Sequence, residues 1–184
     1  MRYSIWVLFL AAAMVFPAPV MNAAESAAFQ EKLSVLIGKP KEGLVIVESL
    51  RPSPDSKHVT CIVKKGKQFA VMYDGKAQTY YDAISQDSPF YSPDHKQLAY
   101  KAKKRGKWLM VVNEKEGPGF DEIGIVAFSP DSSRIAYVVQ DNEKQYVVVN
   151  NVKEKTGYDG IPQKMNLAFS PDSKHLAYMA MKGK

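Results

Sequence analysis

From residue 44 onward, the apolar positions of the chain fall into short runs separated by turn residues. Runs such as "QLAYKA", "RIAYVV", "FAVMY" and "WLMVV" are rich in β-branched and aromatic residues. Segments of this length and composition are typical of β-strands. Asp74-Gly75, between two such segments, is a strong signal for a tight hairpin. The pattern therefore predicts an all-β domain.

These runs belong to an internal repeat. A Ser-Pro-Asp triplet occurs four times, and its aspartates are 39, 37 and 41 residues apart: Asp55, Asp94, Asp131 and Asp172. An aromatic residue follows the first three aspartates after 14 or 15 residues, at Phe69, Trp108 and Tyr146. A turn residue follows after 19 or 20, at Asp74, Asn113 and Asn151, and an aromatic-Asp-x-Ile signature then occupies 81–84, 120–123 and 158–161. Because three markers stay in register, we predict repeat units of about 40 residues.

Each unit is predicted to contain four short antiparallel strands. The first runs into the triplet, where Ser-Pro-Asp-Ser favours a type I turn because proline presets its backbone angle. The aspartate carboxylate can accept hydrogen bonds from nearby backbone amides in such a turn. We expect the second and third strands to form a hairpin and the fourth to carry the aromatic-Asp-x-Ile signature. Four antiparallel strands in every unit of about 40 residues is the pattern of a β-propeller blade.

The segments "FSPDSKHLAYMA" and "YVVVNN…GYDGI" resemble the WD-repeat-like β-propeller repeats of TolB-type periplasmic proteins. Similar blades occur in the propeller domains of prolyl-oligopeptidase-type serine peptidases. The resemblance covers residues 44–184 and implies a β-propeller fold with a bias toward partner binding. We place the blades at about 44–84, 88–123 and 124–161, with a partial blade at 165–184.

The fourth unit is expected to be incomplete. By the spacing of the first two units, its third-strand aromatic residue would fall near position 186. Two strands would then be missing and a sheet edge would be exposed, which natural proteins normally protect. We therefore expect a fragment of a longer propeller, whose ring is closed by missing C-terminal sequence or by another chain.

The N-terminal residues differ in pattern from the repeats. Arg2 precedes the uncharged apolar run "YSIWVLFLAAAMVF", and "PAPV" and small residues follow, which predicts a cleaved signal peptide over residues 1–24. The alternative is a membrane anchor, but the run is short for a spanning helix. Residues 25–43 carry apolar positions at helical spacing before Gly38 and Pro40, so we expect a short helix and linker. Export predicts a periplasmic or secreted protein of the bacterial cell envelope, without a membrane span after cleavage.

Charge and cysteine content narrow the possible partners. The net charge is +6, which becomes +5 once Arg2 is removed with the signal peptide. This mildly basic balance, together with export, argues against nucleic acid as a partner. The single cysteine, Cys61, excludes an internal disulfide. Cys61 occupies a column that holds half-buried tyrosines in the other units, so we interpret it as a buried, unreactive thiol.

The histidines do not form a metal site in this interpretation. His58 and His175 share a repeat column with Gln97 and Arg134, which we expect to be solvent-facing polar residues. His95 shares its column with serines, and no cysteine or carboxylate pair completes a zinc-ligand set. The sequence also lacks a G-x-S-x-G elbow and a phosphate-binding glycine-rich loop. We therefore assign no catalytic, cofactor-binding or metal-binding residue, and expect an enzyme only if a catalytic domain follows residue 184.

Two columns of recurrent aspartates leave an alternative open. The Ser-Pro-Asp aspartates and the signature aspartates Asp82, Asp121 and Asp159 could ring a channel and bind cations. The favoured interpretation is structural, because a residue needed in every unit usually makes the hydrogen bonds of its own turn or strand end.

Basic residues gather in the loops between the second and third strands of the first two units, whereas the corresponding third loop is "QDNEKQ". Blade geometry would place these loops on one face, as a basic arc bordered by an aromatic residue. The arc consists of Lys64, Lys65, Lys67, Lys101, Lys103, Lys104, Arg105 and Lys107, and Trp108 borders it. All of these except Lys101 are taken as candidates for partner binding. Hairpin tips are usually only solvated, and the alternative is that an acidic protein or anionic envelope polymer docks there. Without Lys101, these eight residues are the candidate partner-binding site.

Export, repeated blades and the lack of a catalytic constellation favour a non-catalytic β-propeller scaffold that mediates protein–protein interaction in the cell envelope. One alternative is the propeller portion of a larger hydrolase, such as a prolyl-oligopeptidase-type serine peptidase, which a downstream G-x-S-x-G motif would reveal. Another is a propeller that binds a glycan or small ligand at its axis. No cofactor is expected in the favoured interpretation.

Overall fold

The computed structural model describes residues 44–55, 57–162 and 167–183. The predicted signal peptide, 1–24, and the predicted helix and linker, 25–43, lie outside the described residues. Within those described ranges the secondary structure is entirely β, as predicted. The described part of the chain accordingly contains no helix long and apolar enough to cross a membrane.

The first three units each form a sheet with the predicted strand order. The first sheet consists of β1 (Leu44–Pro52), β2 (Val59–Lys65), β3 (Gln68–Tyr73) and β4 (Lys76–Ala77). The second consists of β5 (Ala83–Ile84), β6 (Phe90–Tyr91), β7 (Leu98–Lys104), β8 (Lys107–Val112) and β9 (Lys115–Phe120). In it, β5 and β6 both pair with β7, as two halves of an interrupted first strand.

The third and fourth sheets continue the series. The third consists of β10 (Glu122–Phe128), β11 (Ile135–Asp141), β12 (Lys144–Val149) and β13 (Val152–Lys153). The fourth is a two-stranded sheet of β14 (Ala168–Phe169) and β15 (Leu176–Ala177). All pairs of neighbouring strands in the four sheets are antiparallel.

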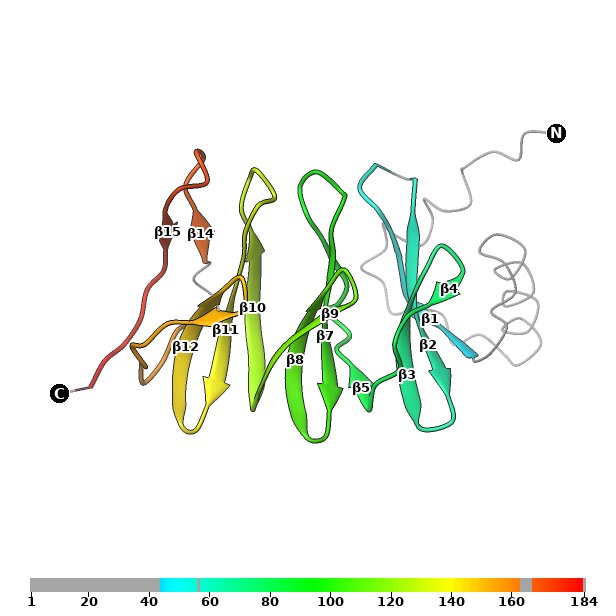
Figure 1. Cartoon of the computed structure of the whole chain (residues 1–184), viewed down its shortest axis with the longest axis horizontal. Helices are drawn as coiled ribbons and strands as arrows, with labels where there is room; N and C mark the ends of the chain where they lie inside the picture. Colours follow the sequence, from blue (N-terminus) through cyan, green and yellow to red (C-terminus); the bar gives the residue numbers. More distant parts are fainter. Residues whose placement is uncertain (1–43, 56, 163–166, 184) are drawn as a thin grey trace.

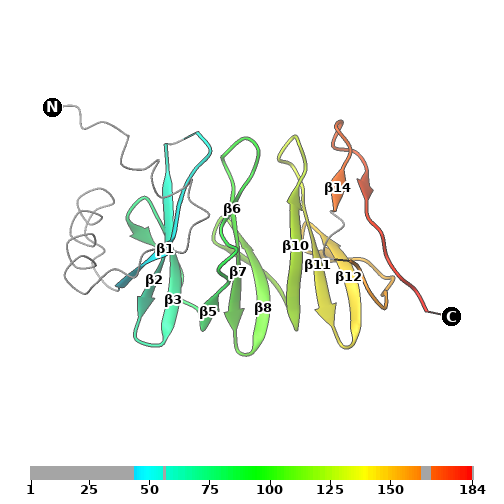
Figure 2. The same cartoon turned by 180° about the vertical axis from the view of Figure 1, so that it is seen from behind.

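The four sheets stand side by side in chain order along the longest axis of the molecule (Figures 1 and 2). We call the interface between the first and second sheets the first junction, and number the next two likewise. Ile62 packs against Tyr100 in the first junction, Met110 against Tyr137 in the second, and Val138 lies in a cluster with Tyr178 in the third. Burying apolar faces between successive sheets explains why a single unit would not be stable alone.

The tyrosine column faces the preceding sheet throughout. Tyr100 and Tyr137 have no exposed surface, so they are more deeply buried than the half-buried positions that we expected. Cys61 takes this position in the first sheet, where it packs with Val63 and Met72. It is 1% exposed, and burial raises the pKa of its thiol to about 12. The predicted buried thiol is confirmed.

The aromatic-Asp-x-Ile signature spans two sheets, which differs from our expectation that the fourth strand carries all of it. Its aromatic residue pairs with the third strand of its own sheet, as Tyr81 does with Phe69. Its isoleucine belongs to the next sheet, where Ile84 pairs with Ala102 of β7. The chain therefore passes between sheets at Asp82. The reason is geometric: three residues are enough for an extended chain to leave one sheet and enter the next.

The third unit departs from the predicted column assignments by one residue. Gln145, not Tyr146, pairs with the signature aromatic Tyr158, as Phe69 pairs with Tyr81. Successive side chains on a strand point to opposite faces, so Tyr146 faces the second sheet whereas Phe69 faces the sheet that follows it. Likewise Asn150, rather than Asn151, occupies the turn position.

The turn position itself has one structural role in three sheets. Asp74, Asn113 and Asn150 all adopt positive φ, between 45° and 48°. Each side chain accepts a hydrogen bond from the backbone amide that begins the second strand, at 2.9–3.0 Å. Aspartate and asparagine tolerate this left-handed conformation better than most residues, which explains why they occupy the column.

Candidate functional site

The loops lie on two opposite edges of the array. The Ser-Pro-Asp turns, which join the first strand of each sheet to the second, form the upper edge in Figure 1, called here the turn edge. The β2–β3, β7–β8 and β11–β12 hairpin tips form the lower edge, called here the hairpin edge. The candidate partner-binding residues lie at the hairpin edge, as predicted from the repeat.

The aspartates of the turn edge stabilise their own turns. In the third sheet, the Ser129 hydroxyl donates to Asp131 at 2.6 Å, and the Ser133 amide donates to the same carboxylate at 3.0 Å. Hydrogen bonds from Ser129 and Ser133 lower the pKa of Asp131 to about 2. The same serine–aspartate bond, at 2.5–2.6 Å, lowers the pKa in the other three turns, at Asp55, Asp94 and Asp172. These contacts match the structural interpretation of this column.

The signature aspartates connect each sheet to the next, rather than serving only their own unit. Asp82 accepts the amide of Arg105 at 2.8 Å, Asp121 accepts that of Asn142 at 3.0 Å, and Asp159 accepts that of Gly183. Each acceptor thus ties the end of one sheet to the hairpin loop of its successor. Among the described residues, no group of three or more metal-ligating side chains gathers here or elsewhere. Hydrogen bonding therefore accounts for both aspartate columns.

The eight candidate residues lie on the first two hairpins, which are adjacent at the hairpin edge. Lys64 and Lys65 end β2 and Lys67 lies in the following turn, while the other five surround the β7–β8 turn. Lys104 pairs with Glu116 at 2.8 Å, and Lys107 with Asp121 at 2.5 Å. Both pairs are solvent-exposed, so they contribute little to stability.

Four other cationic candidates are not ion-paired within the described residues: Lys64, Lys67, Lys103 and Arg105. Lys64 lies over the ring of Phe69 at 5.5 Å and Lys103 over that of Trp108 at 5.6 Å. These contacts hold the ammonium groups in place without neutralising them. Within the part of the chain that the structure describes, neither lysine has a carboxylate partner, and the same is true of Lys67 and the Arg105 side chain.

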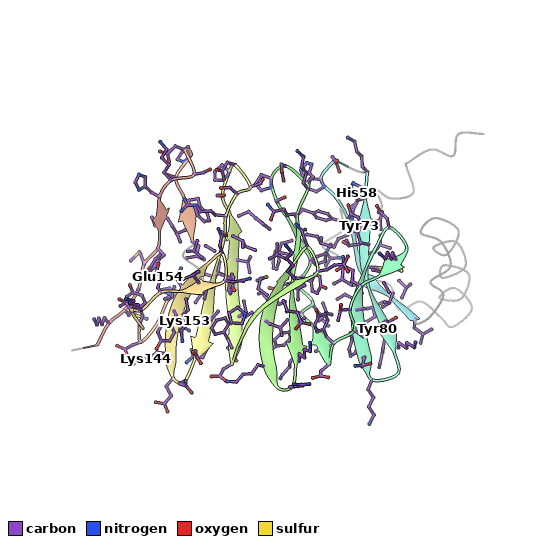
Figure 3. All side chains as sticks on the ribbon, in the orientation of Figure 1. His58, Tyr73, Tyr80, Lys144, Lys153 and Glu154 are labelled. Atoms are coloured by element: carbon purple, nitrogen blue, oxygen red, sulfur yellow. The ribbon has the colours of Figure 1, made fainter. Side chains whose placement is uncertain are left out.

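The third hairpin differs from this basic arc in the charge of its side chains. Its tip runs Asp141, Asn142, Glu143, Lys144, so it holds two acidic side chains and one basic side chain. Lys144 pairs with Asp159, and Lys153 pairs with Asp141 at 2.5 Å (Figure 3). The third hairpin therefore lacks the excess of positive charge that the first two hairpins carry.

A cavity of about 510 Å³ lies beside the basic arc in the first junction. Ile46, Ile62, Phe69 and Ile84 form apolar walls, and Ser49, Arg51 and Gln86 add polar atoms. The Phe69 ring lines the cavity, and the Lys64 ammonium lies over that ring. Lys103 lies on the adjacent hairpin, but Trp108, over which it lies, packs in the second junction. The first junction thus combines apolar surface with one neighbouring cation, Lys64.

The second junction has a buried ion pair in the corresponding region. Lys101, which we expected in the basic arc, occupies the repeat column of Ile62, and its side chain is only 8% exposed. It therefore does not belong to the exposed arc, because it faces a sheet junction. Its ammonium lies 2.6 Å from Asp87 and 5.6 Å from the centre of the Phe90 ring. Burial raises the pKa of Asp87, but hydrogen bonds from Lys101 and Ser85 outweigh it and leave that pKa below its usual range.

The sequence analysis missed both the cavity and this ion pair. The cavity depends on side chains from β1, β2, β3 and β5 meeting across two sheets, which no single column reveals. The sequence does contain an indication of the ion pair, because Lys101 stands in a repeat column whose other members include the apolar residues Ile62 and Val138.

Comparison with known proteins gives similarity in structure but not in sequence. No protein-family model and no curated protein sequence matches the chain. One similar solved structure is TolB from Acinetobacter baumannii, at 15% identity and a TM-score of 0.45, over 73% of this chain and 38% of that one. Another is the Cps50 (Swd1) β-propeller domain of Myceliophteria thermophila, at 10% identity and a TM-score of 0.40, over 82% and 50%.

The chain thus spans half or less of the length of either structure. Both TM-scores are below 0.5, so the fold rests on the chain's own sheets: four-stranded antiparallel units, repeated side by side. The fold is of the β-propeller type.

Proposed function

We propose that this chain is a non-catalytic β-propeller scaffold, exported to the cell envelope, which binds a protein partner at the hairpin edge of its first two sheets. The observation that carries the proposal is the apolar cavity of the first junction, where Lys64 lies over the lining residue Phe69 without a carboxylate partner among the described residues. Lys103, on the adjacent hairpin, adds a second unpaired cation to the same edge. Protein-binding surfaces commonly combine a buried apolar anchor with a polar, charged rim.

The partner suited to this surface is an acidic segment with one large apolar side chain. The apolar side chain would enter the cavity between Ile62, Phe69 and Ile84. One carboxylate beside it would approach Lys64, which lies over the cavity residue Phe69, and a second would approach Lys103 on the adjacent hairpin. Such charges would raise the association rate and make it dependent on salt.

A non-catalytic role is supported by the state of the residues that resemble catalytic groups. Cys61 is buried and its pKa is raised, so it would not supply a thiolate nucleophile. His58 bonds to Asp74 at 2.6 Å and stacks on Tyr73, outside any arrangement with a serine or cysteine nucleophile among the described residues. Export is supported by the signal-peptide pattern of residues 1–24, and mass spectrometry of the mature N-terminus in an expressing bacterium tests it.

We also propose that the fourth sheet contacts further strands, from more C-terminal sequence or another chain. The support is Met179, which is 56% exposed. It stands in the repeat column of Ile62 and Val138, which pack in the junctions with the following sheets. Light scattering coupled to size exclusion tests the intermolecular form: a strictly monomeric chain at all concentrations would leave only the intramolecular form.

Binding of defined peptides tests the proposed partner site. The probe is a fluorescent acidic peptide with a central leucine, compared with the same peptide carrying serine instead. We expect the leucine peptide to bind more tightly, and the Lys64→Glu, Lys103→Glu double variant to lose this binding. The matched control is Lys115→Glu with Lys155→Glu, which changes net charge equally at exposed positions outside the arc. Equal binding by both double variants would contradict the proposed site.

A further inference from the structure

The turn edge is closed by hydrogen bonds at the second and third junctions. The Asp94 amide donates to the Ser132 hydroxyl, and the Asp131 amide to that of Ser173, both at 3.0 Å. The Gln97 side chain donates to the Ser132 carbonyl at 2.5 Å, and Arg134 likewise donates to the carbonyl of Ser173. Gln97 and Arg134 are therefore inter-sheet contacts, which corrects our expectation that this column only faces solvent.

The first junction departs from this arrangement at the same two columns. His95 stands in place of the bridging serine, with the same positive φ of about 61°. His58 stands in place of Gln97 and Arg134, but it turns back to its own sheet. There it bonds to Asp74 at 2.6 Å and stacks on Tyr73, with ring centres 5.0 Å apart (Figure 3). Among the described residues, His58 therefore makes no contact that corresponds to those of Gln97 and Arg134, and His95 approaches Asp55 of the first sheet at 3.9 Å.

A second cavity, of about 230 Å³, lies at this site. Its lining combines two aromatic rings with amide and carboxylate groups: Tyr73, Tyr91, Gln78, Gln97, Asn113 and Glu114. The Gln78 Oε1 atom is buried, and it has no hydrogen-bond partner within the described part of the chain. A buried acceptor without a partner is costly, so the site is suited to a ligand that supplies a donor.

We propose that this cavity binds one sugar ring of a neutral carbohydrate. A sugar ring presents a C–H face, which packs on tyrosine rings, and a rim of hydroxyls, which amide and carboxylate side chains bind. Gln78 Oε1 has almost no accessible surface, so the amide group would turn toward the cavity before a sugar hydroxyl donates to it and satisfies the unpartnered acceptor. The volume is below the range of roughly 300–1,000 Å³ typical of sites for drug-sized molecules, in keeping with a single ring.

The charges around the cavity select a neutral ligand over an anion. Lys96 and Glu114 both line it, so neither sign dominates. This also distinguishes the site from the basic arc, which lies at the opposite edge of the same two sheets. The carbohydrate proposal is therefore independent of the protein-binding proposal, and either can fail alone.

Saturation-transfer NMR on the full chain tests the inference, with glucose, galactose, mannose and N-acetylglucosamine at millimolar concentration as probes. We expect at least one sugar to give a signal. Gln78→Leu should weaken its binding about tenfold, the usual effect of losing one hydrogen bond, without lowering the melting temperature, because leucine removes the unpartnered acceptor. Glu114→Ala, at an exposed position, should weaken binding in the same direction.

Gln140→Leu is the matched control, since Gln140 lies on β11 away from the cavity. The control and the Lys64→Glu, Lys103→Glu variant should both bind sugar normally. Lack of signal from every sugar overturns the proposal, as does sugar binding that persists unchanged in both folded cavity variants. If Gln78→Leu does not fold, Glu114→Ala alone decides between these outcomes.

Discussion

The first and second junctions are built from the same repeat columns, yet they differ in what those columns do. At the second junction Lys101 forms a buried ion pair with Asp87, and Ser132 receives hydrogen bonds from two groups of the preceding turn. At the first junction the corresponding positions hold Ile62 and His95, and two cavities lie there instead. A repeat fold thus fixes where sheets meet, whereas individual substitutions decide whether a junction is closed or can bind.

The largest expected effect comes from truncating Tyr137 in the second junction. Its side chain is fully buried against the second sheet. Tyr137→Ala should destabilise the chain by about 3–5 kcal/mol, as for other large aromatic residues cut to alanine in a core. Denaturant unfolding followed by circular dichroism measures this. Tyr137→Phe is the control: it removes only the hydroxyl that donates to Asn151 at 2.8 Å, at a cost of about 1 kcal/mol. Equal losses in both variants would show that packing is not the main contribution.

A second prediction concerns Lys101 of the second junction, whose repeat column holds Ile62 in the first junction. Lys101→Ala removes a buried stem and the partner of Asp87, and should cost about 2 kcal/mol. The cost is below that of breaking a fully buried pair because the Asp87 side chain is 55% exposed and can be hydrated. Lys101→Ile, which restores the aliphatic residue of this column, should recover most of the loss, since well-packed apolar groups often replace buried ion pairs without penalty. An isoleucine variant as unstable as the alanine variant would contradict this account.

These two residues also show how far sequence reasoning reaches. The tyrosine column was predictable because each member meets the same kind of neighbour, so recurrence reflects a shared environment. The strand order and the role of the Ser-Pro-Asp turns followed for the same reason. The inter-sheet role of Asp82 was not predictable, because its partner Arg105 lies in the next unit and contributes a backbone amide that carries no sequence signal.

The candidate site likewise has features that the sequence predicts and features that depend on contacts between units. The basic arc was predictable from loop composition, because hairpin loops at equal spacing lie at one edge. Ion pairing of Lys104 and Lys107 was not, since Glu116 and Asp121 reach them only through the fold of β9 and the chain that follows it. The position of His58 could not be predicted either: its column predicted an exposed residue, whereas its ring bonds to Asp74 and stacks on Tyr73.

A third prediction uses pH to separate turn stabilisation from junction packing. Hydrogen bonds hold the pKa of Asp131 at about 2, below its ordinary value near 4. A lowered folded-state pKa contributes stability that is complete above the unfolded value and is lost as the pH falls through the folded value. The melting temperature should therefore fall as the pH is lowered from about 5 to about 2, because four turns share this contact. Asp131→Asn should flatten the fall, whereas Glu122→Gln, which lies at an exposed position, should not. A profile unchanged by Asp131→Asn would contradict the role assigned to the turn.

The smallest expected effect comes from filling the larger cavity of the first junction with an additional apolar group. This substitution tests whether the cavity is used for binding. Ile84 lines that cavity from β5 and belongs to the same buried cluster as Ile62. Ile84→Phe adds apolar volume beside Ile62, and should stabilise the chain by about 0.5–1 kcal/mol, as cavity-filling substitutions commonly do. The same variant should weaken binding of the acidic leucine peptide but leave that of the serine peptide unchanged, because only the former uses the apolar volume. Ile123→Phe, at the same signature position on β10 of the third sheet, is the matched control, and should leave both peptides unaffected. A gain in stability without any change in leucine-peptide binding would mean that the cavity is a packing defect, and the proposed anchor would then have to lie elsewhere on the hairpin edge.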